Sequence, residues 1–265
     1  MYKLVALDMD GTLLKDDLTI APGTIEAIQR AAAQGTIITI ATGRMFASAK
    51  QFAKQLKINV PLITYQGALI QDLQSEKVIY ERSLSEEIGH RLIEIAEERN
   101  LHLQVYQDDL LYGAVDNDRL REYAEKVKVP YTVDPNLRAL ATKGFTKAIY
   151  IGEPDYLEGM QDEMKERFGS SAHITKSTPY FLEVTHPEAN KGAALRELAN
   201  HLNIPLAQTI GVGDNFNDTE LLEVAGLGVA MGNAVEPLKQ HADFITLSNN
   251  DEGVKHVIEK FILNG

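Results

Sequence analysis

Short apolar runs alternate with amphipathic stretches along the first third of the chain. This pattern predicts buried strands at residues 3–8, 36–41 and 60–65, and helices at residues 22–34 and 46–56. Pro22 suits the first turn of the earlier helix, and Gly35 suits its end. Strand–helix–strand order at these lengths indicates βαβ units and a mostly parallel sheet.

The last third of the chain repeats this alternation. Helices are expected at residues 191–203, 218–225, 235–240 and 252–263, and strands at residues 208–212, 226–230 and 244–246. This segment is therefore assigned to the same kind of α/β layer structure as the first third.

The middle of the chain has a different pattern. Ser85 can cap a helix that runs to about residue 100, with Glu86 and Glu87 in its first turn. Further helices are expected from residue 116 and at 154–168, with short strands at residues 101–106, 110–114, 147–151, 172–176 and 180–185. This mixture is typical of a separate α+β unit. We therefore predict that residues 84–184 form a domain inserted between two halves of one core, residues 1–83 and 185–265.

Composition narrows the class of function. The chain has 265 residues, of which 44% are hydrophobic and 24% charged, so it can bury a core without disulfides or metals. Its formal net charge of −12 argues against nucleic acid and anionic membranes as partners, since both attract a basic surface. The absence of cysteine excludes disulfide scaffolds, thiol nucleophiles, and iron–sulfur or zinc-finger sites.

Acidic residues interrupt the N-terminal apolar run. The run at residues 4–7 is followed by Asp8 and Asp10, which argues against a membrane-spanning helix or a secretion signal there. We therefore expect a cytoplasmic protein.

Two carboxylates, Asp8 and Asp10, lie two positions apart at the end of the first predicted strand. Open α/β sheets bind their ligands at the carboxyl ends of the strands. Side chains two apart on a strand point the same way, so these charges repel unless a cation or proton lies between them. Gly11 then allows a sharp backbone turn. The plainer interpretation is a polar strand end followed by an Asp-Gly turn.

A second acidic segment follows the strand predicted at residues 208–212. It contains Asp214, Asn215, Asn217 and Asp218. Hard oxygen ligands of this kind suit Mg²⁺, which binds through one or two carboxylates together with substrate phosphate and water. A helix cap is the alternative interpretation, but a cap needs one such residue and this segment has four.

Two further positions could bind an anion. Thr42 and Gly43 lie between a strand and a helix, where hydroxyl and backbone N–H groups favour phosphate, and Arg44 could add a guanidinium. Lys191 begins a predicted helix, where the helix dipole slightly disfavours a cation, and this suggests a compensating anion. Alone, each position is more commonly a helix cap or a solvated lysine. Together, the four segments fall at one edge of the predicted sheet, whereas the seven histidines show no ligand spacing.

These motifs resemble those of the haloacid dehalogenase superfamily, and of its Cof-type phosphatases in particular. The four superfamily motifs occur in order, at Asp8–Thr12, Thr42, Lys191 and Gly213–Asp218. The insert lies where Cof-type proteins carry a C2-type α+β cap domain, and residues 64–68 and 251–254 also resemble that group. The resemblance implies an α/β fold with a Rossmann-like three-layer core, a mostly parallel sheet and an inserted α+β cap domain.

The resemblance also implies a role for each motif. Asp8 would attack phosphorus and form an aspartyl-phosphate, and Asp10 would be the general acid and base. Mg²⁺ would be the cofactor, held by Asp8, the Asp10 backbone carbonyl and Asp214, with Asp218 acting through water. The phosphoryl oxygens would be contacted by Met9, Thr42, Gly43, Lys191 and Asn217, the first and third through backbone amides.

Residues that contact the leaving group of the substrate are harder to identify from the sequence. Arg44, Tyr180 and Glu183 are the candidates. Gln66 stands where the group commonly has asparagine, which leaves a contact from its side chain open.

The favoured function is a Mg²⁺-dependent phosphatase acting on phosphomonoesters of small metabolites, with sugar phosphates ahead of flavin mononucleotide and pyridoxal phosphate. One alternative is a sugar phosphomutase on the same scaffold, and another is a non-catalytic sensor of phosphorylated ligands. A glycosidase-like pair of Asp8 and Asp10 ranks last, because it would leave the second acidic segment idle. The expected partner is a small phosphorylated metabolite, and the protein is expected to be a monomer or small homo-oligomer.

Overall fold

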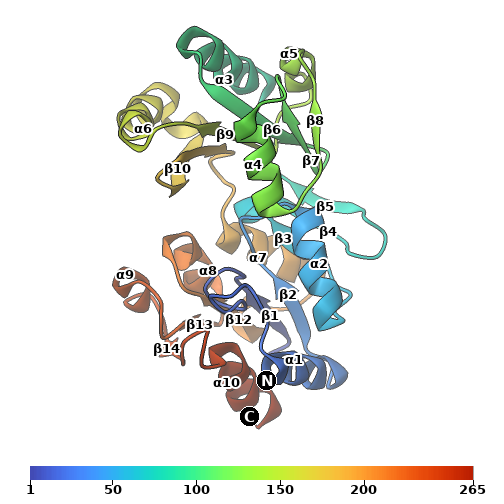
Figure 1. The fold of residues 1–265 in the computed structure, drawn as a ribbon. Helices are drawn as coiled ribbons and strands as arrows, with labels where there is room; N and C mark the ends of the chain where they lie inside the picture. The colour runs from blue at the N-terminus through green and yellow to red at the C-terminus, as the bar shows by residue number, and fades with distance from the viewer. Residues whose placement is uncertain (265) are drawn as a thin grey trace. The chain divides into compact units, whose positions relative to one another are not determined.

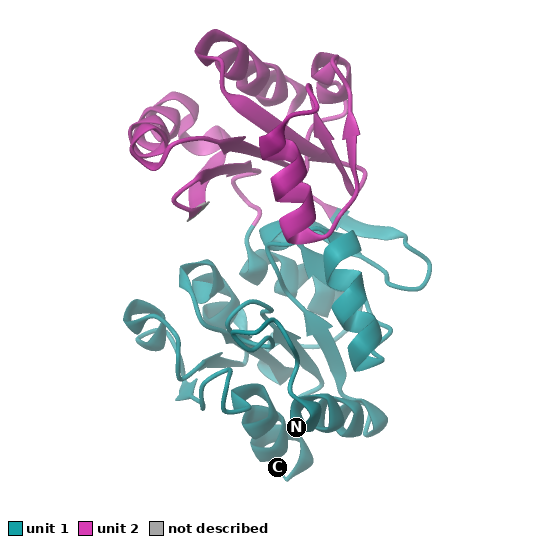
Figure 2. Cartoon of the chain, viewed as in Figure 1, with its two compact units in different colours: residues 1–80, 190–265 teal, residues 81–189 magenta. Residues whose placement is uncertain are grey.

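The computed structural model describes residues 1–264, Ser177 by its backbone alone. The chain forms two compact units (Figure 2). Unit 1 joins Met1–Tyr80 to the segment from Asn190 onward, and unit 2 is Glu81–Ala189. The inserted domain predicted at residues 84–184 lies within unit 2, which is longer by three residues at its start and five at its end.

Unit 1 is built on a five-stranded sheet in the order β14-β13-β12-β1-β2, with every pair parallel (Figure 1). The strands are β1 (Leu4–Leu7), β2 (Ile37–Ile40), β12 (Thr209–Gly213), β13 (Leu227–Ala230) and β14 (Phe244–Ile245). All four side chains of β1 are buried, as expected of a strand covered on both faces. The predicted parallel sheet is confirmed.

Helices complete the three layers of unit 1. They are α1 (Pro22–Ala33), α2 (Phe46–Leu56), α7 (Lys191–His201), α8 (Thr219–Val224), α9 (Glu236–Lys239) and α10 (Gly253–Ile258). α1 packs against α2 and α10, whereas α7 packs against α8. Right-handed crossovers that leave β1 in one direction and β12 in the other place these two groups on opposite faces of the sheet.

The order of the strands creates a switch point at the centre of the sheet. β1 pairs with β2 on one side and with β12 on the other. The chain thus moves outward from β1 through β2 and outward from β12 through β13 and β14. Loops that follow two such neighbouring strands diverge and leave a crevice, which is where sheets of this kind bind ligands. Asp8 and Asp214 follow these two strands directly.

A small second sheet, which lies in unit 1 except for its last residue Glu81, was not expected from the sequence. It contains β3 (Leu62–Thr64), β4 (Leu69–Gln71) and β5 (Val78–Glu81), of which only β3 coincides with a predicted strand. The 3₁₀ turn η1 (Tyr65–Gly67) joins β3 to β4. Strands this short carry too few alternating positions to give a signal.

Unit 2 is the α+β domain that the sequence predicts. Its six-stranded sheet has the order β10-β11-β9-β6-β7-β8, antiparallel except for the β7–β8 pair. The strands are β6 (His102–Gln107), β7 (Leu110–Gly113), β8 (Tyr131–Val133), β9 (Lys147–Ile151), β10 (His173–Thr178) and β11 (Phe181–Thr185). The helices are α3 (Glu86–Arg99), α4 (Asp118–Val127), α5 (Leu137–Ala141) and α6 (Pro154–Phe168). Ser85 caps α3 as predicted, whereas β8 and α5 were missed.

Residues at both ends of unit 2 hold it together beyond the predicted boundaries. Arg82 lies 3.3 Å from the Glu188 carboxylate, and the Thr146 hydroxyl donates to Glu81 over 3.2 Å.

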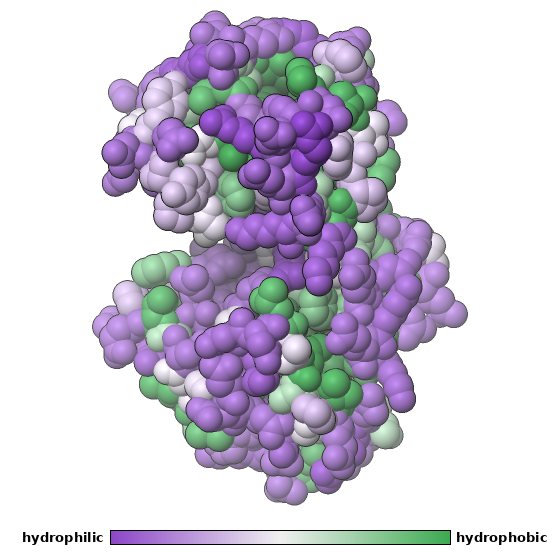
Figure 3. Space-filling model, viewed as in Figure 1, coloured by the Kyte–Doolittle hydropathy of each residue, from purple (hydrophilic) through white to green (hydrophobic). Residues whose placement is uncertain are grey.

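Among the described residues of the whole chain, no helix has the length and apolar character needed to cross a membrane. The face seen in Figure 3 is largely hydrophilic, with its apolar residues in small groups.

A buried ion pair lies within the sheet of unit 2. Ala148 and Tyr150 of β9 belong to the apolar cluster under α3 and α6, so Lys147 projects from the opposite face. Lys147 Nζ lies 2.7 Å from Glu183 Oε2 on the neighbouring strand β11, with side-chain exposures of 6% and 5%. Burial alone would lower the pKa of Lys147, but the Glu183 carboxylate raises it above its usual value. Both groups therefore depend on each other for charge compensation.

Lys147→Met leaves the Glu183 carboxylate buried without its counter-ion, so we expect the free energy of unfolding to fall by about 3–5 kcal/mol. Adding Glu183→Leu should recover most of that loss, because no charge then remains buried. Urea unfolding followed by circular dichroism measures both variants. Lys143→Met is the control, since its pair with Asp108 is exposed at 74% and 71% and its loss should barely move the midpoint. An equal loss in the single and double variants would show that the pair contributes through packing instead.

Candidate active site

The loops that follow β1 and β12 approach each other closely. Gly11 has a φ of 81°, and a Cβ atom there would lie 2.4 Å from Asp214 Oδ2, so only glycine fits. The next residue, Thr12, donates its hydroxyl hydrogen to Asp214 Oδ1 over 3.0 Å. The tight turn predicted after Asp10 therefore brings the first acidic motif against the second.

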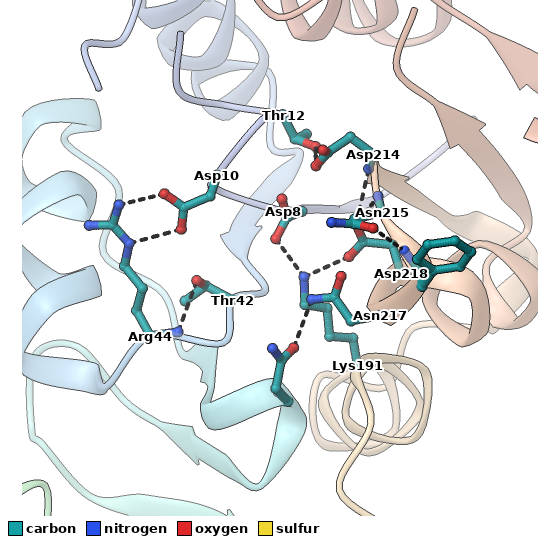
Figure 4. Close-up of polar contacts among 12 residues, drawn as sticks. Asp8, Asp10, Thr12, Thr42, Arg44, Lys191, Asp214, Asn215, Asn217 and Asp218 are labelled. Carbon is teal, nitrogen blue, oxygen red and sulfur yellow. Dashed lines mark hydrogen bonds and ion pairs between the residues drawn. The ribbon is translucent and has the colours of Figure 1, made fainter. Parts of the chain in front are cut away.

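Lys191 joins the two motifs from the start of α7 (Figure 4). Its ammonium group donates to Asp8 Oδ1 over 2.5 Å and to Asp218 Oδ1 over 2.6 Å. All three side chains are buried, and Lys191 is fully so. The compensating anion expected for a lysine at a helix N-terminus is thus a pair of carboxylates.

Burial dominates the protonation behaviour of this cluster. It raises the pKa of Asp8 well above its usual range, and the charges of Asp218 and Asp214 add to the effect while Lys191 opposes it. Burial and the Asp218 charge also raise the pKa of Asp214. For Lys191, burial alone would lower the pKa, but the Asp218 and Asp8 carboxylates raise it well above its usual value. The single positive charge of Lys191 therefore does not fully compensate the three neighbouring carboxyl groups.

Asp218 organises the loop after β12. Its Oδ2 accepts hydrogen bonds from the backbone N–H groups of Asp214 (3.0 Å) and Asn215 (3.1 Å). Its Oδ1 accepts from Lys191, so both carboxylate oxygens have partners. Asp218 therefore fixes the loop that presents Asp214, in addition to contributing its charge.

The cluster has the composition of a divalent metal site. Asp8, Asp214 and Asp218 each offer a carboxylate oxygen, and these oxygens lie within 4.8 Å of one another. Hard oxygen donors with excess negative charge fit a divalent cation such as Mg²⁺. The Asp10 carboxylate does not belong to this group in the structure.

Asp10 instead faces Arg44, as Figure 4 shows. Arg44 Nε and Nη2 donate to the two Asp10 oxygens over 2.9 and 2.5 Å, in a bidentate pair. The Arg44 guanidinium also lies 5.2 Å from the centre of the Phe52 ring. The Asp10 side chain remains half exposed, at 51%. Arg44 thus contacts a predicted catalytic carboxylate, and its contact with substrate stays a prediction.

Two of the predicted phosphate-binding residues, Thr42 and Asn217, are drawn with Asp8 and Lys191 in Figure 4. Thr42 is buried, and its Oγ1 accepts from the Arg44 backbone N–H over 3.2 Å. The Met9 side chain is fully buried, which leaves only the backbone of that residue for the predicted contact. Asn217 Nδ2 donates to Gln66 Oε1 over 2.9 Å. Gln66 therefore contacts a predicted phosphate-binding residue, although the sequence marked it only as a departure from the family pattern.

Sequence reasoning also missed two asparagines that hold the loop after β1. Asn233 Nδ2 donates to the Gly11 carbonyl over 2.8 Å. Asn249 is buried, and its Nδ2 donates to the Leu14 carbonyl and to Asp16 Oδ1, each over 3.0 Å. The Asn249 backbone N–H donates to Asn233 Oδ1 over 2.9 Å, which links the two side chains. The only signal was the neighbouring segment 251–254, noted for its resemblance alone.

Tyr180 and Glu183 belong to unit 2. Tyr180 lies in the turn between β10 and β11 and is 53% exposed, whereas Glu183 is buried against Lys147. Their contact with a substrate stays a prediction.

Comparison with known proteins agrees with this geometry. A family model described as haloacid dehalogenase-like hydrolase matches residues 5–258. The 5-amino-6-(5-phospho-D-ribitylamino)uracil phosphatase YitU of Bacillus subtilis is 30% identical over 269 residues, which cover 97% of each chain. The crystal structure of TM0651 from Thermotoga maritima is 37% identical, with a TM-score of 0.91 over 98% of each chain. The HAD subclass IIB sugar phosphatase BT4131 gives a TM-score of 0.83 at 25% identity, again over 98% of each chain.

The family model and these relatives extend over nearly the whole chain, including the inserted α+β unit. YitU and BT4131 are both named as phosphatases, and the acidic loops and buried lysine at the switch point supply groups that phosphate ester hydrolysis uses. We conclude that the chain belongs to the haloacid dehalogenase superfamily and is a Cof-type phosphatase.

Proposed function

We propose that this phosphatase hydrolyses phosphomonoesters of small metabolites in a Mg²⁺-dependent reaction through an aspartyl-phosphate on Asp8. The observation that carries the proposal is the contact of Lys191 with Asp8 at the switch point. It holds a carboxylate nucleophile beside a fixed cation, at the edge where the sheet binds ligands.

Asp8 and Asp10 would divide the chemistry between them. An Asp8 oxygen forms a bond to phosphorus while the bond from phosphorus to the leaving oxygen breaks. Asp10 gives its proton to that leaving oxygen, and then takes a proton from the water that hydrolyses the aspartyl-phosphate. Asp10 lies on the turn after β1 and is half exposed, so its side chain can reach a group bound at this edge once its pair with Arg44 opens.

Charge neutralisation is the second requirement. A carboxylate cannot approach a phosphate dianion unless cations offset the repulsion. Lys191 offers one positive charge, and a bound Mg²⁺ would supply the remainder by neutralising charge on the phosphoryl oxygens. Asp8 and Asp214 would hold that ion directly, with Asp218 acting through water. Thr42 and the Gly43 backbone would orient the phosphoryl oxygens.

The proposed substrates are phosphorylated sugars and polyols. YitU is named for a substrate with a phosphorylated ribityl chain, and BT4131 is named as a sugar phosphatase. Both names describe a phosphate ester on a polyhydroxylated carbon chain. Flavin mononucleotide shares this ribityl phosphate feature and belongs on the same test panel, together with pyridoxal phosphate.

Phosphate release across a panel of phosphorylated metabolites tests the proposal. We expect release in Mg²⁺ that EDTA abolishes, and a loss of more than about 1,000-fold in kcat for Asp8→Asn because the nucleophile is gone. Malachite green assays of released phosphate give the rates. Activity that survives in Asp8→Asn would contradict the aspartyl-phosphate, and undiminished activity in EDTA would contradict the metal requirement.

Asp10→Asn removes the proton donor but keeps the shape of the side chain. We expect kcat to fall by roughly 100- to 10,000-fold, the usual contribution of a general acid and base. Esters with good leaving groups, such as p-nitrophenyl phosphate, should lose less in the first step because they need no protonation. An equal loss for good and poor leaving groups would remove the acid role from Asp10.

Lys191→Met should abolish activity and destabilise the fold, because two buried carboxylates lose their shared cation. We expect the free energy of unfolding to fall by about 3–5 kcal/mol in metal-free buffer. Urea unfolding measures the loss, and adding Asp218→Asn should reduce it. Lys239→Met is the control, since its partner Glu236 is 78% exposed, and it should leave the midpoint nearly unchanged. A stable Lys191→Met protein would show that the carboxyl groups are neutral without the lysine.

A further inference from the structure

The turn between β3 and β4 has an unusual backbone. Tyr65 and Gln66 have φ values of 53° and 60°, and Gly67 follows at 97°. Two consecutive residues other than glycine in the left-handed region are unfavourable, and such conformations persist only where the surroundings enforce them. Strain of this kind gathers at functional sites, so the contacts of the turn indicate what it positions.

Three contacts within unit 1 hold the turn in place. The Tyr65 backbone N–H donates to the Arg44 carbonyl over 2.9 Å, and that of Gln66 donates to the Thr42 carbonyl over 3.0 Å. A Cβ atom on Gly67 would lie 2.2 Å from the Asn190 carbonyl oxygen, which places the turn directly against the start of α7. The turn therefore joins the loop that carries Thr42 to the helix that carries Lys191.

The strained backbone directs the Gln66 side chain across the Thr42–Arg44 loop. Gln66 Nε2 occupies the space where a side chain on Gly43 would begin, since a Cβ there would lie 2.3 Å from it. Gln66 Oε1 accepts a hydrogen bond from Asn217 Nδ2 over 2.9 Å. Among the described residues 1–264, the Gln66 side chain makes this hydrogen bond alone. Its Nε2 hydrogens are therefore available to a ligand.

We propose that Gln66 binds the phosphoryl group of the substrate, donating from Nε2 to a phosphoryl oxygen while its Oε1 orients the Asn217 amide. This inference rests on the proposed function, because the ligand is the phosphate ester that Asp8 attacks. One Asn217 Nδ2 hydrogen points to Gln66, which directs the other away from Gln66 and toward the same ligand. Gln66 thus adds a neutral donor beside Thr42 and sets the direction of a second donor.

Gln66→Glu is the sharpest variant, because it keeps the acceptor for Asn217 and replaces only the Nε2 donor with an anionic oxygen. We expect the dissociation constant for inorganic phosphate, measured by calorimetry in Mg²⁺ buffer, to rise roughly 10- to 100-fold, the range for a lost hydrogen bond to a charged group. KM for the best substrate of the panel should rise by a similar factor. Gln51→Glu adds the same charge at an exposed position of α2 and should change neither constant.

Gly43→Ala supplies a second variant that leaves the chemistry of Gln66 unchanged. The added methyl group would displace the Gln66 amide, so phosphate affinity should fall. If this loss acts through Gln66, the double variant with Gln66→Ala should bind phosphate no more weakly than Gln66→Ala alone. Thermal unfolding of each variant confirms that the comparison is made on folded protein.

The outcomes separate this inference from the proposed function. Wild-type protein that binds phosphate but releases none from the panel would contradict the proposed function and leave the binding test of Gln66 intact. Unchanged phosphate affinity in Gln66→Glu and Gln66→Ala would overturn the role of Gln66. A fall in kcat with unchanged phosphate affinity would also overturn it, since Gln66 would then act only through Asn217.

Discussion

The candidate active site of this protein depends on one buried cation. Lys191 is fully buried and compensates Asp8 from one acidic loop and Asp218 from the other, so the carboxylates of the two loops can lie close together. Without that charge, the same carboxyl groups would have to separate, take up protons or recruit a cation from solvent. The raised pKa values of Asp8 and Asp214 show that one lysine compensates the charge of these carboxylates only in part. The residual negative charge makes this edge attractive to a divalent ion, and the same ion would then be available to a phosphate group.

Hydrogen bonds from side chains to the backbone fix the remaining geometry around this charge. Asp218 holds the Asp214 loop through two backbone N–H groups, and Asn233 and Asn249 hold the opposite loop through backbone carbonyls. These supports come from loops that follow three different strands. An edge organised in this way keeps its carboxylates close together before any ligand binds, so little rearrangement is left for the reaction itself.

The sequence predicted the parallel sheet, the inserted α+β unit and the acidic loops because each has a strong local pattern. The apolar run of β1 ends directly at Asp8, and α2 and α6 begin and end at the predicted residues. Contacts between distant residues could not be predicted in this way. The pair of Arg44 with Asp10 and the link of Asn249 to Leu14 depend on how loops meet in space, and neither has a spacing that identifies it. The sequence named Gln66 but left its contact open for another reason, since its left-handed backbone is unusual for glutamine and only the surrounding contacts enforce it.

The pairing of β1 with β12 also delays completion of the unit 1 sheet until late in synthesis. Leu4 pairs with Thr209, so one edge of the apolar strand β1 has no partner until about 200 further residues have been made. At about 5–20 residues per second, that delay lasts roughly 10–40 s. All strands of the six-stranded sheet lie between residues 102 and 185, so they emerge earlier and can complete their own ladder first. The insert can therefore complete its sheet while β1, which leads to Asp8, still has an open edge that chaperones would protect.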